Sequence, residues 1–184
     1  MKYTKDWLID QAKQAQRIKY LFFWGHTPST DGSIKATCFS QWWAEHPFEE
    51  NGVVYQTAEH YMMAGKARLF DDKEILEQIL GAKSAAEAKK LGRMVKGWNQ
   101  KTWETERCKI VVQGNYLKFS QHTELKTFLL QTTSRVIVEA SPLDRIWGIG
   151  IDKEHESAAD PINWKGENLL GFCLMEVRDR LLGH

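Results

Sequence analysis

Cysteine is scarce in this sequence, and long apolar runs are absent. The 184 residues contain three cysteines, which lie far apart and fit neither a zinc-site spacing nor a disulfide framework: Cys38, Cys108 and Cys173. No apolar run approaches the length needed to span a bilayer, and the residues after Met1 contain no apolar signal region. We therefore expect a protein of the reducing cytoplasm with no membrane partner.

The motifs of several enzyme classes are also missing. The sequence has no Gly-x-Gly-x-x-Gly after a strand, no phosphate-binding loop, no Gly-x-Ser-x-Gly, no His-Glu-x-x-His and no Cys-x-x-Cys. Hydride transfer, nucleoside triphosphate hydrolysis and zinc catalysis are therefore poor hypotheses, and we expect no cofactor and no metal. The formal net charge of +1 gives no strongly basic footprint for nucleic acid, although it does not exclude a local basic groove.

Apolar and aromatic residues, by contrast, are plentiful. The chain is 42% hydrophobic, which suits one domain with a sizeable core. Its eight tryptophans are many for this length. We expect most of them in the core, and the others could form flat walls on which bases or sugars stack.

Local patterns predict a mainly helical α+β fold, a single domain with a small antiparallel sheet. Helical periodicity, capping residues and glycine stops predict helices over residues 5–19, 57–70, 71–80, 84–92, 98–119, 122–132 and 168–182. The first helix has an apolar stripe that includes Ala15 and Ile18. Aromatic and β-branched runs predict strands at 20–24, 53–55 and 136–138, and residues 145–150 could extend along the sheet. Asn51-Gly52 is a strong hairpin signal before the second strand.

The predicted helix after Thr57 places one acid and one base on an otherwise apolar face. At helical spacing this face, which we expect to point inward, contains Glu59, Met62, Met63, Lys66 and Phe70. Glu59 and Lys66 are two turns apart, roughly 10 Å along the axis, whereas a simple helix ion pair spans three or four residues. This spacing leaves room for a ligand between two groups whose pKa values burial can tune for acid–base or nucleophilic chemistry.

Each of these polar residues also has a purely structural interpretation. Glu59 near a helix start could only complement the helix dipole, and Lys66 could extend its ammonium to solvent. Arg93 follows a predicted helix end, where it would either contact carbonyl groups or bind an anion such as phosphate. His26, in a polar loop after the first strand, could be a surface histidine, and Asn168 is first a helix cap.

The chemistry that remains is that of carboxylates, one lysine, arginines and aromatic walls. This set suits cleavage of a bond through a cationic, oxocarbenium-like transition state, in which carboxylates stabilise the sugar cation or activate water. The aromatic residues would hold the base.

Several short motifs, in the same order along the chain, resemble the NADAR family, the YbiA-like N-glycosidases. The resemblance covers residues from about Tyr20 to the C-terminus, so we expect an N-terminal amphipathic helix extension at 1–19 and a catalytic domain at 20–184. The matching motifs are Phe23-Trp24-Gly25-His26, Thr57 to Met63, Lys66-Ala67 with Phe70, Leu91-Gly92-Arg93, Trp103, Lys118-Phe119, Glu139 to Pro142, Asp144, Trp147 to Gly150, Trp164, Gly166 to Asn168, Leu170-Gly171 and Arg178.

The resemblance implies hydrolysis of N-glycosidic bonds, with two candidate substrates. One is ADP-ribosyl-guanine in nucleic acid, and the other is a phosphorylated ribosylamino-pyrimidine of riboflavin synthesis. It implies Glu59, Lys66 and Asp144 as catalytic groups. In one chemistry proposed for the family the lysine captures ribose C1 as a Schiff base, and in the alternative it stabilises charge as the bond breaks. The implied substrate-binding residues are Trp24, Gly25, His26, Arg93, Trp103, Trp147, Gly148 and Asn168.

One position departs from the pattern of the family. Some members have an acid two residues after the tryptophan that corresponds to Trp147, and this chain has Ile149 there. Asp152 could substitute for it, or the substrate could differ. Two other interpretations remain at this stage: a non-catalytic ADP-ribose- or nucleotide-binding module that uses the same pocket, and a structural helical domain. The structural domain would not explain an acid and a lysine on an apolar helix face.

Overall fold

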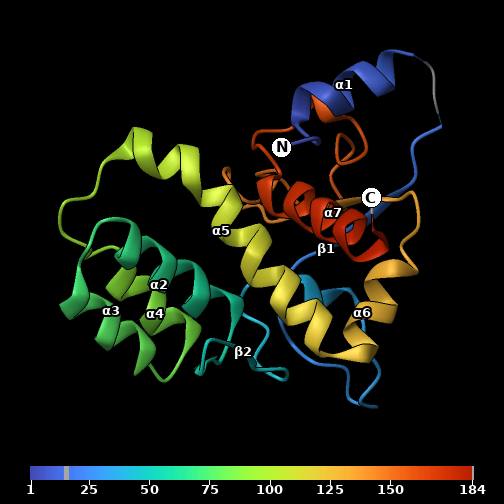
Figure 1. Cartoon of the computed structure of the whole chain (residues 1–184). Coiled ribbons are helices and arrows are strands. Elements are labelled where there is room, and N and C mark those ends of the chain that lie inside the picture. The colour runs from blue at the N-terminus through green and yellow to red at the C-terminus, as the bar shows by residue number, and fades with distance from the viewer. Residues whose placement is uncertain (15–16, 184) are drawn as a thin grey trace. The chain divides into compact units, whose positions relative to one another are not determined.

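The computed structural model describes residues 1–14 and 17–183, and the helices dominate it (Figure 1). The described residues form seven α-helices, two short 3-10 helices and two two-stranded sheets, one of them antiparallel. The predicted mainly helical α+β class is therefore confirmed. The chain divides into two compact units: unit 1, made of Met1–Ser40 with Glu124–His184, and unit 2, made of Gln41–Thr123.

Unit 2 is a group of helices that follows a β-hairpin. Its elements are β2 (Phe48–Glu50), β3 (Val53–Tyr55), α2 (Ala58–Leu69), α3 (Lys73–Leu80), α4 (Ala85–Gly92) and α5 (Gln100–Gln121). The two strands pair antiparallel, with Phe48 opposite Tyr55. Asn51 and Gly52 between them both have positive φ, at 53° and 79°, as the two-residue turn of a hairpin requires. The predicted hairpin is therefore confirmed.

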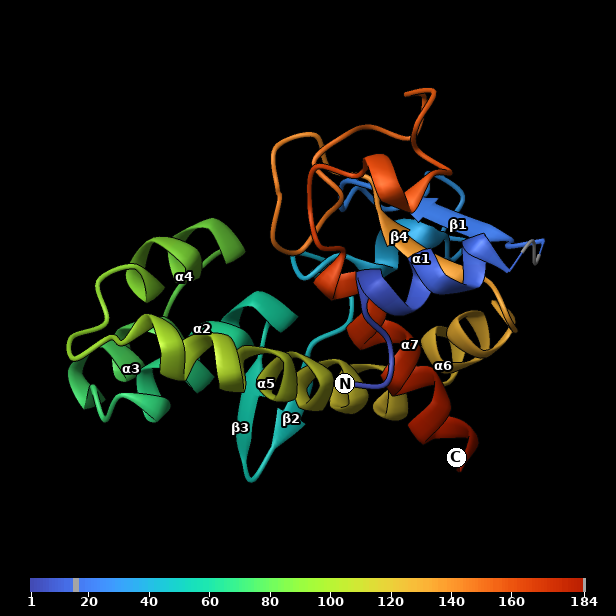
Figure 2. The same ribbon diagram turned by 90° about the horizontal axis from the view of Figure 1, so that it is seen from above.

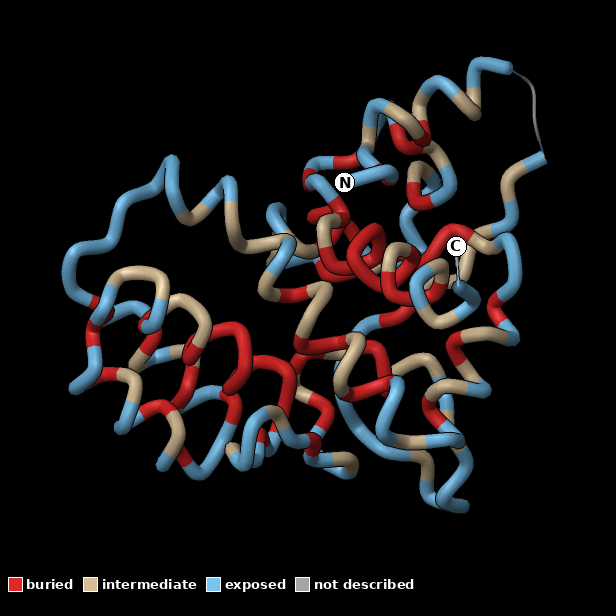
Figure 3. Tube along the Cα trace, viewed as in Figure 1, coloured by how far each residue is buried: buried red, intermediate tan, exposed pale blue. Residues whose placement is uncertain are grey.

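Helix α2 is the central helix of unit 2 and packs against α3, α4 and α5. Thr57 caps it by accepting a hydrogen bond from the backbone N of His60, as predicted. Helix α4 approaches α2 closely because it presents a glycine, Gly92, to Met63 of α2. A Cβ on Gly92 would lie 2.0 Å from Sδ of Met63. Figure 3 shows the resulting burial along α2.

Unit 1 contains a parallel pair of strands covered by a helix. Its elements are α1 (Lys5–Lys13), β1 (Tyr20–Phe23), β4 (Val136–Glu139), α7 (Leu169–Leu182) and α6 (Thr123–Leu130), whose first residue belongs to unit 2. Strands β1 and β4 lie side by side, with Tyr20 opposite Val136 (Figure 2). Helix α7 packs on β4. The sequence patterns predicted both strands but not their parallel pairing.

Two predicted elements differ in the structure. The first helix ends at Lys13, and residues 17–19 are not helical, so the expected helix over 5–19 was too long; Ala15 lies outside the described residues. Residues 145–150 form no strand, and only the N of Ile149 bonds to the end of β4, at the oxygen of Glu139. Among the described helices, none is both long and apolar enough to cross a membrane.

Candidate active site

The predicted site residues divide between the two units. Four lie in unit 2: Glu59, Lys66, Arg93 and Trp103. The others lie in unit 1: Trp24, Gly25, His26, Asp144, Trp147, Gly148 and Asn168.

Lys66 of α2 has the most specific surroundings of the unit 2 residues. Its half-buried side chain donates from Nζ to the backbone oxygen of Gly92 at 2.8 Å. The same nitrogen lies 5.5 Å from the ring centre of Trp98 and 5.7 Å from that of Trp103. Lys66 therefore does not extend into solvent as a surface lysine does. Trp98 was not among the predicted site residues, because nothing in the sequence marks its proximity to Lys66.

The surroundings of Lys66 act on its protonation in two directions. The indole faces attract an ammonium, which favours the charged form. Burial removes water from the ammonium, and this desolvation lowers the pKa of Lys66 below its usual value of 10.5. A lysine with a lowered pKa is neutral at lower pH than an ordinary one, and the neutral amine is the nucleophilic form.

Glu59 lies in the first turn of α2 with only 3% of its surface exposed. An acid that only complements a helix dipole has no need of burial, which removes water from the charge and raises its free energy. The burial therefore favours the functional interpretation of Glu59. Its backbone is held as well, because its N donates to the oxygen of Gln41 at 2.9 Å.

A chain of two buried amides supports the start of α2. Nδ2 of Asn115 on α5 donates to Oε1 of Gln41 at 2.7 Å and to the oxygen of Val111 at 2.9 Å. Nε2 of Gln41 lies 3.4 Å from the oxygen of Ala58, next to Glu59. These bonds fix the orientation of both amides, and they tie the backbone that presents Glu59 to the middle of α5.

Arg93 lies just beyond α4, where its backbone N donates to the oxygens of Lys89 and Lys90. Its side chain is exposed and makes no hydrogen bond or ion pair with the described residues. The carbonyl groups at this helix end therefore do not occupy the guanidinium, which is available for an anion.

In unit 1, Asp144 organises the loop that follows β4. Its Oδ1 accepts hydrogen bonds from the backbone N of Ile146 at 2.8 Å and of Trp147 at 2.7 Å. Asp144 is partly exposed, and its Oδ2 makes no hydrogen bond with the described residues. One carboxylate oxygen thus fixes the loop and the other is available for chemistry.

Two predicted binding residues have clear structural tasks. Asn168 is fully buried at the start of α7; its Oδ1 accepts from the N of Glu139 and its Nδ2 donates to the oxygen of Ile137, both at 2.9 Å. It therefore ties β4 to α7 rather than capping the helix through its side chain. Gly148 is also buried, and a Cβ there would lie 2.9 Å from the oxygen of Glu139.

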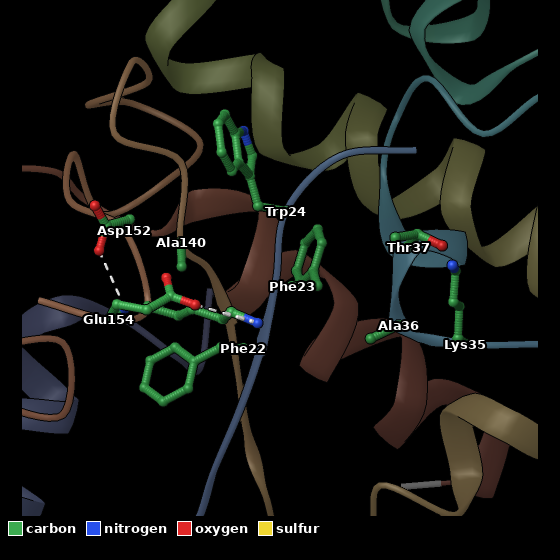
Figure 4. A pocket seen from close by; sticks show the side chains of 10 residues that line it. Phe22, Phe23, Trp24, Lys35, Ala36, Thr37, Ala140, Asp152 and Glu154 are labelled. Atoms are coloured by element: carbon green, nitrogen blue, oxygen red, sulfur yellow. Dashed lines mark hydrogen bonds and ion pairs between the residues drawn. The ribbon is translucent and has the colours of Figure 1, made fainter. Parts of the chain in front are cut away.

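A pocket of about 460 Å³ opens where the chain leaves β1 and β4 (Figure 4). Its lining includes Phe22, Trp24, Lys35, Asp152 and Glu154. The indole of Trp24 is 55% exposed, as a stacking surface would require. Gly25 follows in the left-handed region, and the exposed His26 lies outside the lining.

Position 149, where the chain departs from the family pattern, lies apart from the pocket lining. Ile149 is fully buried in the core of unit 1, where a carboxylate would be desolvated. Asp152, three residues later, is exposed and lines the pocket with Trp24, and its Oδ1 accepts from the N of Glu154 at 3.1 Å. An acid is therefore present in the same loop.

The neighbouring imidazoles of His46 and His122 in unit 2 do not offer a metal site. Nε1 of Trp43 donates to Nδ1 of His46 at 2.9 Å, which takes the lone pair of that ring. Nε2 of His122 contacts the oxygen of Pro47 at 2.8 Å, so this nitrogen carries the proton. His46 therefore has no lone pair left for a metal ion.

Comparisons with known proteins agree on one family. A family model described as "NADAR domain" matches residues 22–182. The chain is 40% identical over 165 residues to "N-glycosidase R617" of Acanthamoeba polyphaga mimivirus, covering 88% of this chain and 95% of that protein. It is 35% identical over 144 residues to "Riboflavin biosynthesis protein PYRR, chloroplastic" of Zea mays, covering 73% of this chain and 21% of that protein.

A solved structure confirms the fold. The NMR structure of the E. coli protein YbiA matches with a TM-score of 0.67 and 31% sequence identity, and the match covers 91% of each chain. The fold is therefore YbiA-like, as the sequence resemblance implied.

Proposed function

We propose a substrate class for this chain, which belongs to the NADAR family and is therefore a hydrolase of N-glycosyl bonds. The substrate is a ribosylated base. Two forms fit the resemblance: ADP-ribosyl-guanine in nucleic acid, and a phosphorylated ribosylamino-pyrimidine of riboflavin synthesis. The observation that carries this proposal is that the half-buried Lys66 lies on the same helix as the buried Glu59. The ammonium of Lys66 is bonded to the backbone oxygen of Gly92 and lies near the rings of Trp98 and Trp103.

In the proposed reaction, Lys66 is the nucleophile. Its neutral amine forms a bond to ribose C1 while the bond from C1 to the base nitrogen breaks. The base leaves with the bonding electrons and takes up a proton from an acid, the role we assign to Glu59. The bond from C1 to the ring oxygen then breaks as the ribose ring opens; the ring oxygen takes up the proton that the lysine nitrogen loses, and the adduct becomes a Schiff base. Water hydrolyses the Schiff base to the free sugar and returns the free lysine.

The other predicted residues support this reaction in the proposal. Asp144 stabilises the developing cation or activates the water through Oδ2, which the loop does not use. Arg93 and backbone donors near Gly25 bind phosphate, and Trp24, Trp103 and Trp147 provide stacking surfaces. His26 completes the binding surface, and the buried Gly148 contributes from behind it, because the missing side chain lets the loop approach the oxygens of Glu139 and Asp144.

The expected location and domain arrangement are proposals too. We propose a cytoplasmic protein whose residues 20–184 form the catalytic domain and whose residues 1–19 are an extension. The extension is attached to unit 1, since Nζ of Lys5 donates to the oxygen of Trp164 at 2.8 Å and the hydroxyl of Tyr3 donates to Asp179 at 2.8 Å.

The test is a turnover assay by mass spectrometry on both substrates, with the wild type, Lys66→Ala and Lys66→Arg. We expect the wild type to release free base from one substrate, and both variants to lose that release. Reduction with borohydride during turnover should leave a ribosyl adduct on the peptide that contains Lys66. Full activity in Lys66→Ala would contradict the assignment of the nucleophile, and turnover of neither substrate by the wild type would contradict the substrate class.

A further inference from the structure

The connection between α4 and α5 is basic in a chain that is otherwise balanced. The whole chain has 25 lysines and arginines against 24 acids. Between Glu87 and Glu104, however, it has five cationic residues and no acid: Lys89, Lys90, Arg93, Lys96 and Lys101. We call residues 89–101 the α4–α5 segment, which lies wholly within unit 2.

Internal partners account for only two of these five charges. Nζ of Lys96 pairs with Glu74 of α3 at 2.9 Å, and Nζ of Lys89 lies 5.7 Å from the ring centre of Trp42. The side chains of Lys90, Arg93 and Lys101 are exposed and make no hydrogen bond or ion pair with the described residues. Three cations of the α4–α5 segment are therefore available to a ligand.

Helix stability does not explain all three. Lys90 lies in the last turn of α4, where a cation complements the helix dipole. Lys101 lies in the first turn of α5, where the dipole disfavours a cation, and that turn has no acid to offset it. Arg93 is the C-cap residue of α4, so its charge also complements the dipole, but its guanidinium makes no hydrogen bond to the carbonyl groups there. The charge at 101 therefore points to an anionic partner rather than to the fold, and the guanidinium at 93 is available to the same partner.

The same segment exposes apolar surface. Met94 is 54% exposed and Trp98 is 47% exposed, although both are large hydrophobic residues. One face of Trp98 lies near the ammonium of Lys66, so the segment adjoins the proposed nucleophile. Cations that bind phosphates, interleaved with aromatic faces on which bases stack, characterise sites for single-stranded nucleic acid.

We propose that the α4–α5 segment docks a single strand of nucleic acid. This inference rests on the proposed function and narrows its substrate to a ribosylated base within a polynucleotide. The unpaired bases beside the modified one stack on Trp98 and Met94, and their phosphates contact Lys90, Arg93 and Lys101. A duplex would not present base faces to these side chains. A small ribosylamino-pyrimidine phosphate has a single phosphate and would leave most of the segment unused.

The test compares charge reversal inside and outside the segment. The variant Lys90→Glu/Lys101→Glu leaves Arg93 and Trp98 unchanged, because both lie in the proposed catalytic or binding machinery. The matched control Lys19→Glu/Lys73→Glu changes two other exposed lysines and makes the same change in net charge. The side chains of these lysines also make no hydrogen bond or ion pair with the described residues. One substrate is ADP-ribosyl-guanosine as a single nucleotide, and the other is a single DNA strand of about 20 nucleotides that contains one ADP-ribosyl-guanine. The strand is longer than the ~4–16 nucleotides that single-strand-binding sites cover.

We expect the segment variant to raise KM for the DNA strand about tenfold or more at low salt, with KM for the single nucleotide unchanged. The control should match the wild type on both substrates. Fluorescence anisotropy would measure Kd for an unmodified single strand at several salt concentrations. For the wild type, a plot of log Kd against log salt should have a slope near 0.7 per phosphate contact, or about 2 for three contacts. The segment variant should give a smaller slope.

The two proposals fail in distinguishable ways. Equal KM for the DNA strand in all three proteins, or tighter binding of a duplex than of a single strand, would overturn the docking surface and leave the proposed function intact. If the wild type cleaves neither of these substrates nor the ribosylamino-pyrimidine phosphate, the proposed function fails, and the anisotropy measurement still decides the docking surface on its own.

Discussion

The side-chain amide of Asn115 on α5 is bonded to that of Gln41 at 2.7 Å, and the backbone oxygen of Gln41 accepts the N–H of Glu59. The acid proposed for catalysis, in the first turn of a helix, is thus positioned by a residue 56 places further along the chain, through one intervening amide. The pair is buried, so no water can replace either partner if the other is removed.

Asn115→Ala should therefore impair both stability and catalysis. It leaves Oε1 of Gln41 without its donor, and this lost buried bond costs roughly 1–3 kcal/mol. The oxygen of Val111 loses its side-chain donor but keeps the helical backbone N–H of residue 115. Urea unfolding would measure this loss, and kcat measured well below the unfolding midpoint should fall as well. The control is Ser84→Ala, which removes the cap of α4 for about 1 kcal/mol without touching Gln41. Unchanged kcat in Asn115→Ala would limit this residue to a role in stability.

The lowered pKa of Lys66 predicts how activity depends on pH. The folded-state pKa lies below the unfolded value near 10.5, so the neutral amine becomes the major form at lower pH than in an ordinary lysine. Single-turnover rates should rise with pH and level off below 10.5. An amine-reactive reagent, followed by peptide mass spectrometry, should label Lys66 with a midpoint below that of lysine in an unstructured peptide. Identical midpoints for Lys66 and the peptide lysine would contradict the prediction.

Stability should follow from the same shift. Between the folded and the unfolded pKa of Lys66, the unfolded chain binds more protons, so this group's contribution to stability rises with pH across that window. The contribution is fully present above the unfolded value and is lost as the pH falls through the folded value. The difference in stability between the wild type and Lys66→Met should show this slope in urea unfolding measured at a series of pH values below the unfolded value of 10.5.

Asp144 allows its charge to be separated from its role in the loop. Asn at this position keeps an oxygen that can accept from the N of Ile146 and Trp147, but it removes the carboxylate charge. Asp144→Asn should therefore lower kcat by about 10²–10⁴-fold, as expected for the loss of an acid–base group, while changing stability little. Asp144→Ala should lose activity and stability together. Wild-type activity in Asp144→Asn would remove this residue from the catalytic set.

Gly92 should tolerate no side chain while Met63 is in place. A Cβ at position 92 would lie 2.0 Å from Sδ of Met63, so Gly92→Ala should destabilise the protein by about 1–3 kcal/mol and displace the carbonyl that holds Lys66. Thermal unfolding would measure the first effect, and the labelling midpoint of Lys66 the second. The double variant Gly92→Ala/Met63→Ala should recover the midpoint. No change of midpoint in Gly92→Ala would show that the carbonyl does not position the lysine.

The elements that the sequence predicted best depend on local signals. Thr57 caps α2 and Asn51-Gly52 closes the hairpin through interactions within a few residues, so each could be predicted from its own segment. The inward face with Glu59 and Lys66 followed from helical periodicity. The parallel pairing of β1 with β4 could not be predicted in this way, because the strands join Tyr20 to Val136 and no local pattern specifies so distant a partner.

Three further features could not be predicted from the sequence, each for a specific physical reason. The first helix ends at Lys13 although apolar residues continue at helical spacing, because periodicity alone does not mark where a chain leaves a helix. Asn168 has the composition of a helix cap, but its left-handed backbone turns the side chain towards β4. Trp98 became relevant only when the structure brought its ring to Lys66.

The acceptor for Lys66 is a main-chain atom, and this determines how the site can evolve. Every residue type has a backbone oxygen, so no substitution at position 92 deletes the acceptor chemically; substitution can only move it, by adding a side chain where none fits. In a library that varies each position in turn, residue 92 should accept only glycine, while Lys90, two residues earlier, should accept many types. The size of that contrast would measure how far the backbone shape at residue 92, rather than the chemistry of the neighbouring side chains, determines the position of Lys66.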